Sequence, residues 1–263
     1  MKIFVCALLV MAGAAGPVNA IELTQSAGAA HAYPAMLDSE GKKLANGEFT
    51  QEVEDGLLRI RISYDLLKGG RIEEKAAFQQ RPELIQKEWS WRELKHATLQ
   101  REYKIDFDSG KATARKREEG GTKEWSEQVE IEQGRTFAGF GFTLALQNLR
   151  ERLIKGEAIE LKAVGFTPKP RVVTVKLTWQ GVDRVPMSGR ELRGDNFMIR
   201  PEIPAIAKLF VKLPDTHIWL TRPPAGFLRW EGPLAEPGDQ IVRVDLGSGE
   251  GSAPAIPAAK ERS

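Results

Sequence analysis

The stretch Asp55-Gly56-Leu57-Leu58-Arg59-Ile60-Arg61-Ile62-Ser63-Tyr64 decides the fold class of this chain. From Leu58 to Tyr64 every second residue is apolar, and this period of two places the apolar side chains on one face of a β-strand. Asp55-Gly56 precedes the alternation and Gly69-Gly70 follows it. Both pairs are typical of hairpin turns, because glycine adopts positive φ without a Cβ clash. The sequence therefore predicts a strand joined to its neighbours by tight turns.

The same alternation recurs along most of the chain, interrupted by residues that favour turns. Asp108-Ser109-Gly110 and Gly120-Gly121 are two such interruptions, and the prolines of Thr167-Pro168-Lys169-Pro170 fit a connection better than a central strand. Strands separated by tight turns pair with their sequence neighbours, so the pattern predicts an antiparallel meander. Further strands are predicted at Glu83–Leu94, Arg101–Phe107, Lys111–Glu118, Thr122–Ile131, Ile159–Ala163, Val173–Trp179, Val182–Leu192, Asp195–Arg200, Asp215–Thr221, Gly226–Glu231 and Gln240–Leu246.

One segment has the period of a helix instead. Leu146, Leu149 and Leu153 are spaced to lie on one helical face. Thr143 fits an N-cap, and Gly156 fits a C-terminal stop. A second, short helical turn is predicted at Ile203 to Val211.

Composition divides the chain into a leader, a lead-in, one domain and a tail. Residues 21–46 are rich in Ala, Gly and Ser with no clear period, which predicts a loosely structured lead-in with room for one short strand. Residues 247–263 have little to bury, which predicts a disordered tail. Residues 47–246 contain neither a polar linker nor a repeat, so they are expected to form a single β-rich domain. We expect a mainly β fold, a strongly curved antiparallel sheet or open barrel with one helix packed on its concave side.

Residues 1–20 have the three parts of a secretory signal peptide. Lys2 is followed by an uncharged stretch from Ile3 to Gly16, and Pro17-Val18-Asn19-Ala20 resembles a cleavage site. The alternative is a membrane anchor, but the apolar run is shorter than the roughly 20 residues a spanning helix needs. The lone cysteine, Cys6, lies within this leader and not at its end. The expected mature protein is therefore periplasmic, free of thiols and without a lipid attachment cysteine.

Charge and hydropathy argue against nucleic acid as a partner and against a transmembrane segment after Ala20. The chain has 38 basic and 36 acidic residues, a formal net charge of +2, and no basic cluster typical of nucleic-acid binding. Nothing after Ala20 is apolar for long enough to suggest a transmembrane segment. No protein partner is indicated.

The sequence offers weak support for metal or nucleotide sites, and no cofactor is predicted. The three histidines lie far apart, and Asp215 with His217 is more typical of an ordinary structural or surface pair than of a catalytic or metal pair. Asp106 to Gly110 lacks the glycine and the acid that a calcium loop requires. Gly139-Phe140-Gly141 before the helix could bind an anion, but a close backbone crossing and helix start is the favoured interpretation.

Enzymatic activity is not predicted. No serine lies in a nucleophile elbow, and no pair of carboxylates stands out from the many acids, although glycoside cleavage by such a pair stays open. A hydrolase acting on an envelope polymer is therefore the least favoured hypothesis.

Residues 136–246 resemble the C-terminal half of a group of uncharacterised bacterial envelope proteins, classed as domains of unknown function. The resemblance is carried by the helix with its ending, residues 148–157, by Thr216-His217-Ile218-Trp219-Leu220, and by Leu228-Arg229-Trp230-Glu231-Gly232. It implies a helix ending in glycine before a strand, and it carries over no catalytic residues. The expected architecture is also distantly similar to the half-barrel carriers that move lipoproteins through the periplasm.

Tryptophans give the best functional lead, since all six fall on predicted strands. Such rings can fill a solid core, the favoured interpretation, or line an apolar cavity. A cavity predicts a non-enzymatic periplasmic protein that binds a lipid or other apolar small molecule. A solid core predicts a structural or assembly partner in the cell envelope that uses its charged surface or a strand edge. The candidate ligand-binding residues are Trp89, Trp91, Trp179, Trp219 and Trp230.

Overall fold

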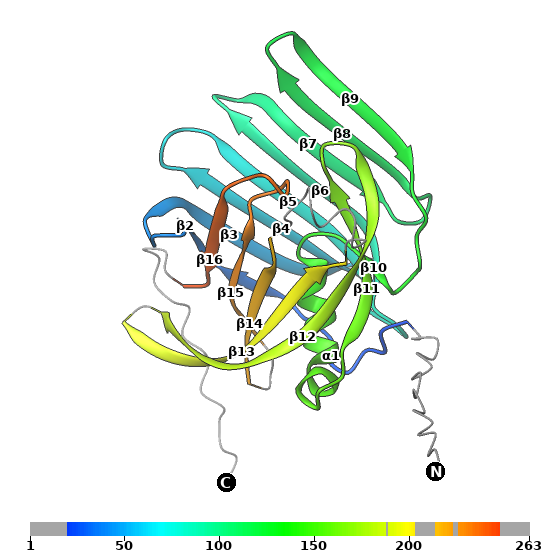
Figure 1. The fold of residues 1–263 in the computed structure, drawn as a ribbon, viewed down its shortest axis with the longest axis vertical. Helices are drawn as coiled ribbons and strands as arrows, with labels where there is room; N and C mark the ends of the chain where they lie inside the picture. Colours follow the sequence, from blue (N-terminus) through cyan, green and yellow to red (C-terminus); the bar gives the residue numbers. More distant parts are fainter. Residues whose placement is uncertain (1–19, 188, 203–213, 223–225, 248–263) are drawn as a thin grey trace, which may run out of the picture.

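The computed structural model describes residues 20–187, 189–202, 214–222 and 226–247. Within these ranges the chain forms one 16-stranded sheet and one helix (Figure 1). The elements are β1 (Ala30–Ala32), β2 (Ala35–Asp38), β3 (Lys43–Glu54), β4 (Leu57–Leu66), β5 (Arg71–Gln79), β6 (Ile85–Lys95), β7 (Thr98–Asp106), β8 (Lys111–Glu118), β9 (Gly121–Gln128), β10 (Thr136–Phe137), α1 (Gly141–Ile154), β11 (Ile159–Phe166), β12 (Pro170–Met187), β13 (Arg190–Pro201), β14 (Thr216–Thr221), β15 (Phe227–Pro233) and β16 (Ile241–Asp245).

The predicted meander is confirmed in the N-terminal half, which we define as β2 to β9. Each of these strands pairs antiparallel with the next along the chain. The turn from β3 to β4 contains Asp55 with φ 51° and Gly56 with φ 77°, the left-handed backbone that Asp-Gly pairs favour. Local turn chemistry therefore sets the order of these strands.

The C-terminal half, β10 to β16, extends the same sheet beyond the edge formed by β2. Its strands from β11 to β16 also pair antiparallel in chain order, whereas β10 and β11 are parallel. The two halves meet where β16 pairs with β2, with Val242 opposite Asp38 and Asp245 opposite Ala35. The full order is β10-β11-β12-β13-β14-β15-β16-β2-β3-β4-β5-β6-β7-β8-β9, with β1 paired to β3.

The boundary expected at residue 46 differs from the structure. The predicted lead-in contains β1, β2 and the start of β3, and Ala35 and Met36 of β2 are buried. β2 has only four residues, too few to show a clear alternation. Ile21 is also buried, and its backbone bonds to Gly134 and Leu84.

The sheet curves around helix α1 without closing, since β9 and β10 stand at opposite ends of the strand order. Figure 1 shows α1 inside this curve, with β11 and β12 passing over it. Its apolar face joins one continuous core with the inner faces of β3 to β8. The predicted fold class, a curved antiparallel sheet with a helix on its concave side, is confirmed. No helix in the described part of the chain is long and apolar enough to cross a bilayer.

The helix ends where the sequence predicts but begins earlier. Gly156 has φ 92° and donates its N–H to the carbonyl of Leu153, which confirms the glycine stop. Phe140, not Thr143, is the N-cap, and it makes no side-chain cap. Thr143 is buried within the first turn. The N-cap prediction is wrong because the first helical turn packs into the core, and this packing stabilises the helix start without a capping hydroxyl.

A further expectation concerns one strand of the C-terminal half. The separate strand predicted at Val182 to Leu192 is wrong, because β12 continues to Met187 and the chain returns as β13 from Arg190. The two strands form one long hairpin, with Val182 opposite Asp195 and Val185 opposite Leu192.

The leader at 1–19, the helical turn at 203–211 and the tail from residue 248 lie outside the described residues.

A buried ion pair ties the helix to the C-terminal half. Arg150 on α1 donates from Nε to Oδ2 of Asp195 on β13 at 2.9 Å, and its Nη2 contacts the same oxygen. The two side chains are 10% and 3% exposed. Two such charge-assisted hydrogen bonds would contribute little at the surface. Here burial largely keeps water from competing for either charged group.

Replacing Arg150 with methionine should therefore lower the free energy of unfolding by about 3–5 kcal/mol, because Asp195 stays buried without its partner. The matched control is Arg152→Met, which removes an exposed ion pair to Glu157. That change should cost less than about 1 kcal/mol. Urea unfolding followed by tryptophan fluorescence measures both, and equal losses would contradict the role given to the buried pair.

Candidate functional site

All six tryptophans lie on strands, as predicted, but the five candidate residues do not form one site. Trp89 and Trp91 on β6 face the core and are 9% and 5% exposed. Trp89 stacks on Phe166 with ring centroids 5.7 Å apart, and Trp91 stacks on Tyr103 at 5.5 Å. Tyr103 and Phe166 also stack on each other, at 4.8 Å. Protein rings therefore cover these two tryptophans.

The other three candidate tryptophans lie in the C-terminal half. Trp219 belongs to a separate cluster with Val185 and Leu228, and its indole N–H donates to Asp183 at 2.8 Å. Trp179 and Trp230 are partly buried against the main core. The Trp179 indole nitrogen is buried and has no hydrogen-bond partner among the described residues.

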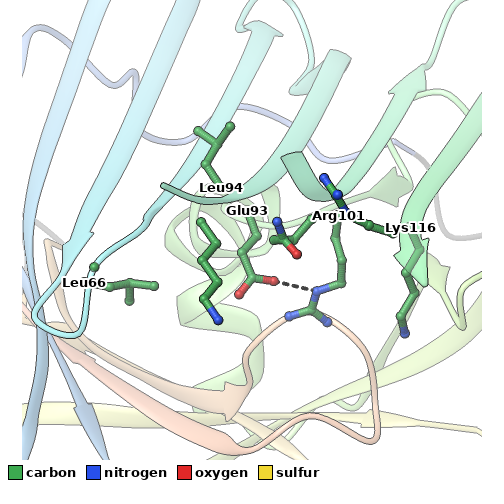
Figure 2. A pocket seen from close by; sticks show the side chains of 9 residues that line it. Leu66, Glu93, Leu94, Arg101 and Lys116 are labelled. Carbon is green, nitrogen blue, oxygen red and sulfur yellow. Dashed lines mark hydrogen bonds and ion pairs between the residues drawn. The ribbon is translucent and has the colours of Figure 1, made fainter. Parts of the chain in front are cut away.

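A pocket of about 290 Å³ opens beside the ends of β6, β7 and β8. Its walls combine two leucines with four basic side chains and one carboxylate, and none of the five candidate tryptophans lines it (Figure 2). The lining residues are Leu66, Gly69, Glu93, Leu94, Lys95, Gln100, Arg101, Lys116 and Arg117.

The pocket forms where the core-facing side of the sheet changes from apolar to charged. Strand register places Trp91, Tyr103 and Ala114 side by side on β6, β7 and β8. Two residues further along, the same faces carry Glu93, Arg101, Lys116 and, on β9, Lys123. We call these last four residues the charged row. An apolar surface therefore ends in a basic margin.

The turn between β15 and β16, residues 234–240, docks on the charged row. Arg101 donates to Asp239 and to Glu93, both at 2.7 Å, and Lys116 contacts the two oxygens of Glu236 at 3.0 and 3.2 Å. The Tyr103 hydroxyl also donates to Glu236. Figure 2 shows Arg101 extending toward this turn with Glu93 beside it. Acids from β6 and from the β15–β16 turn thus meet at one set of cations.

Burial and pairing shift the proton affinities in this network. Burial acts to lower the pKa of Arg101, but hydrogen bonds to Asp239 and Glu93 outweigh it and raise the pKa. Burial and the hydrogen bond to Glu236 raise the pKa of Tyr103. At neutral pH the site therefore offers a charged guanidinium and a protonated phenol, both hydrogen-bond donors to an anion.

This network was missed by the sequence analysis. Arg101 and Lys116 were included in predicted strands, but their partner Glu236 is 120 residues away from Lys116. One usable signal exists in the sequence: Glu93, Arg101 and Lys116 each occupy a core-facing position of an alternating strand. A charged side chain in such a position indicates a buried ion pair or a binding site.

Gly139-Phe140-Gly141 sits against a carboxylate of the protein itself. Oε1 of Glu74 on β5 accepts hydrogen bonds from the Phe140 N–H at 2.8 Å and from the Trp89 indole at 2.7 Å. A Cβ on Gly139 would lie 2.0 Å from that oxygen, and Gly139 has φ 51°. This confirms the close backbone crossing, and the anion at the helix start is Glu74.

The histidines are dispersed as expected. His31 contacts Glu48, and His217 contacts Asn196, while Asp215 pairs with Arg200 at 2.6 Å. In the described part of the chain no group of three His, Cys, Asp or Glu side chains is arranged to hold a metal ion.

No family model and no curated protein matches this sequence. Among solved structures, the chain is similar to the crystal structure of a beta-barrel-like protein of domain of unknown function DUF1849 from Brucella abortus. The identity is 11% and the TM-score 0.45, over 83% of this chain and 98% of that one.

Gly139→Ala should destabilise the protein by about 1–3 kcal/mol, because the added methyl group displaces Glu74 and Trp89 from their hydrogen bond. Gly120→Ala is the control, since a Cβ there meets nothing within 4 Å. Chemical unfolding of both variants tests this difference. A Gly139→Ala protein as stable as Gly120→Ala would show that the crossing is not tight.

Two neighbouring glutamates should give opposite pH dependences. Burial raises the pKa of Glu74 despite the hydrogen bonds from Trp89 and Phe140. For Glu73, burial acts to raise the pKa, but hydrogen bonds from Arg92 and Arg71 outweigh it and lower the pKa. A raised pKa in the folded state removes stability as the pH rises above the ordinary value of 4.5. A lowered pKa adds stability over that same rise.

Relative to wild type, Glu74→Gln should therefore become more stable between about pH 4 and about pH 7, and Glu73→Gln less stable. The glutamine at 74 keeps an oxygen that can accept both hydrogen bonds but cannot ionise. The measurement is the free energy of unfolding of the three proteins at both pH values. Shifts of the same sign in the two variants would refute the assignment.

Proposed function

We propose that this chain is an exported, non-enzymatic protein that binds an amphipathic ligand, such as a lipid, on the concave side of its curved sheet. The observation that carries the proposal is the pocket at the charged row. Leu66 and Leu94 face the same space as Lys95 and Arg117. A wall of this kind suits a molecule with an apolar chain beside an acidic group.

The size of the pocket limits how much of a ligand it encloses. Small-molecule sites commonly measure roughly 300–1,000 Å³. At about 290 Å³ this pocket is just below that range. It therefore fits one end of an amphipathic molecule, and the rest of the molecule needs another apolar surface.

A cluster of partly buried rings offers apolar surface on the concave side. Phe140 at the helix start lies 5.3 Å from Phe49 on β3 and 6.0 Å from Phe227 on β15, measured between ring centroids. All three are packed against the core without being fully buried. Rings of this kind supply large apolar area for a hydrocarbon chain.

Export is supported by the signal-peptide pattern of residues 1–20. A non-enzymatic role is supported by the lack of a nucleophile elbow and of a distinct carboxylate pair in the sequence. The periplasm is the compartment we propose, in line with the thiol-free mature chain. The similarity to half-barrel lipoprotein carriers belongs to this proposal as well.

A second candidate function is that of a structural or assembly partner in the cell envelope. The observation that favours it is the stack of Trp89, Phe166, Tyr103 and Trp91, which fills the space between β6, β7 and β11 with protein side chains. A filled interior leaves the surface and the β9 edge to make contacts.

Mass spectrometry of the protein purified from its native compartment separates the two candidates. Binding predicts a co-purified lipid and uptake of the fluorescent apolar probe N-phenyl-1-naphthylamine. Leu94→Gln should weaken uptake several-fold, since each buried CH₂ contributes about 0.8 kcal/mol. Leu67→Gln is the control, because Leu67 is 59% exposed. A lipid-free protein that ignores the probe would exclude ligand binding and favour the assembly role.

A further inference from the structure

We infer that Arg101, Tyr103 and Lys116 form a binding site for an acidic headgroup, a carboxylate or a phosphate, which Glu236 occupies in this structure. The inference rests on the proposed function and names the chemistry that the ligand presents to the charged row. Glu236 belongs to the turn at residues 234–240 and not to the sheet surface it contacts.

The Glu236 carboxylate is held as a bound anion would be held. It accepts from the Tyr103 hydroxyl, lies 3.0 Å from Lys116 Nζ and 3.8 Å from Arg101 Nη1, and is 13% exposed. Hydrogen bonds between charged groups and anions are about twice as strong as neutral ones. The same three donors would bind the oxygens of a carboxylate or phosphate headgroup.

The turn has a second anchor, so Glu236 can leave without releasing the turn. Oδ2 of Asp239 accepts from Arg101 at 2.7 Å and from the backbone N–H groups of Ala235 and Glu236 at 3.1 and 3.0 Å. Leu234 also donates its N–H to the carbonyl of Gln240 at 3.1 Å. Asp239 thus keeps the turn folded and docked, and Glu236 is the separable arm.

The pocket gives an anion a route to these donors. Arg101 and Lys116 line it, together with Lys95 and Arg117. Within the described residues, Lys95 and Arg117 have no ion-pair partner. Glu93, Glu236 and Asp239 offset three of the four cations at the pocket, and the one positive charge left over attracts an anion before it meets Glu236.

Competition between the ligand and Glu236 gives a test. A ligand that must displace Glu236 binds with an affinity reduced by the fraction of open sites. We expect Glu236→Gln to bind decanoate or decyl phosphate about tenfold more tightly than wild type and to bind decanol equally. Isothermal titration calorimetry with the three probes on the full mature chain measures this, and the stronger of the two anions identifies the headgroup.

Two further variants complete the test. Lys116→Met, at a partly exposed position, should lose at least about threefold in affinity for the anionic probe and keep its affinity for decanol. Glu191→Gln is the matched control, because Glu191 forms an exposed pair with Arg184 on the β12–β13 hairpin. It should bind all three probes as wild type does. Thermal unfolding confirms that each variant is folded.

The outcomes distinguish the two levels of the proposal. If decanol, decanoate and decyl phosphate bind equally in every variant, the anion site is wrong and amphiphile binding stands. If anions are preferred but Glu236→Gln leaves that preference unchanged, the occupancy by Glu236 is wrong. If no probe binds to any of the proteins, the anion site and the proposed function both fail.

Discussion

The Phe140 N–H at the start of helix α1 donates to Glu74 on β5, and Arg150 near the helix end pairs with Asp195 on β13. The first contact belongs to the N-terminal half of the sheet and the second to the C-terminal half. One helix thereby contacts both halves of the sheet, which are also joined by the pairing of β2 with β16, by the stacking of Phe166 on Trp89 and Tyr103, and by the turn at residues 234–240. Because the sheet must wrap around this helix, its concave side faces inward along most of its width. The stacked rings, the charged row and the pocket all depend on this wrapping.

The concave side is organised in rows that run across the strands. The row containing Trp91, Tyr103 and Ala114 is buried, whereas the next row carries Glu93, Arg101 and Lys116. The cost of burying charge is offset there by the acids of the turn at residues 234–240. A single change of residue type along each strand thus separates a solid interior from a polar margin. Ligand binding at the margin is compatible with a filled interior, because none of the five candidate tryptophans lines the pocket.

Local patterns were enough to predict the fold class. The alternation from Leu58 to Tyr64, the turn at Asp55-Gly56 and the stop at Gly156 each depend on neighbours in the sequence, and each is confirmed. The start of the helix and the strand boundaries near 182–192 were wrong because tertiary packing decided them. β2 was hidden because four residues carry too little periodicity.

The candidate site was beyond local reasoning for a related reason. Its acids and cations come from strands far apart in the chain, so no motif joins Arg101 to Asp239 or Lys116 to Glu236. The tryptophans were placed correctly on strands, but the sequence could not show which sheet face Trp219 occupies or that Phe166 covers Trp89. Contacts between distant strands require the register of the whole sheet.

The pairing of β2 with β16 also has a temporal side. Among the described strands β2 is one of the first to be synthesised and β16 is the last, so these two halves cannot join until β16 has been made. Until then β2 presents an unpaired edge beside β3, and such edges attract other chains. Long-range strand pairing is also slow to form. A chain built this way completes its sheet late, and the export that we propose is compatible with this order if the chain crosses the membrane before it folds.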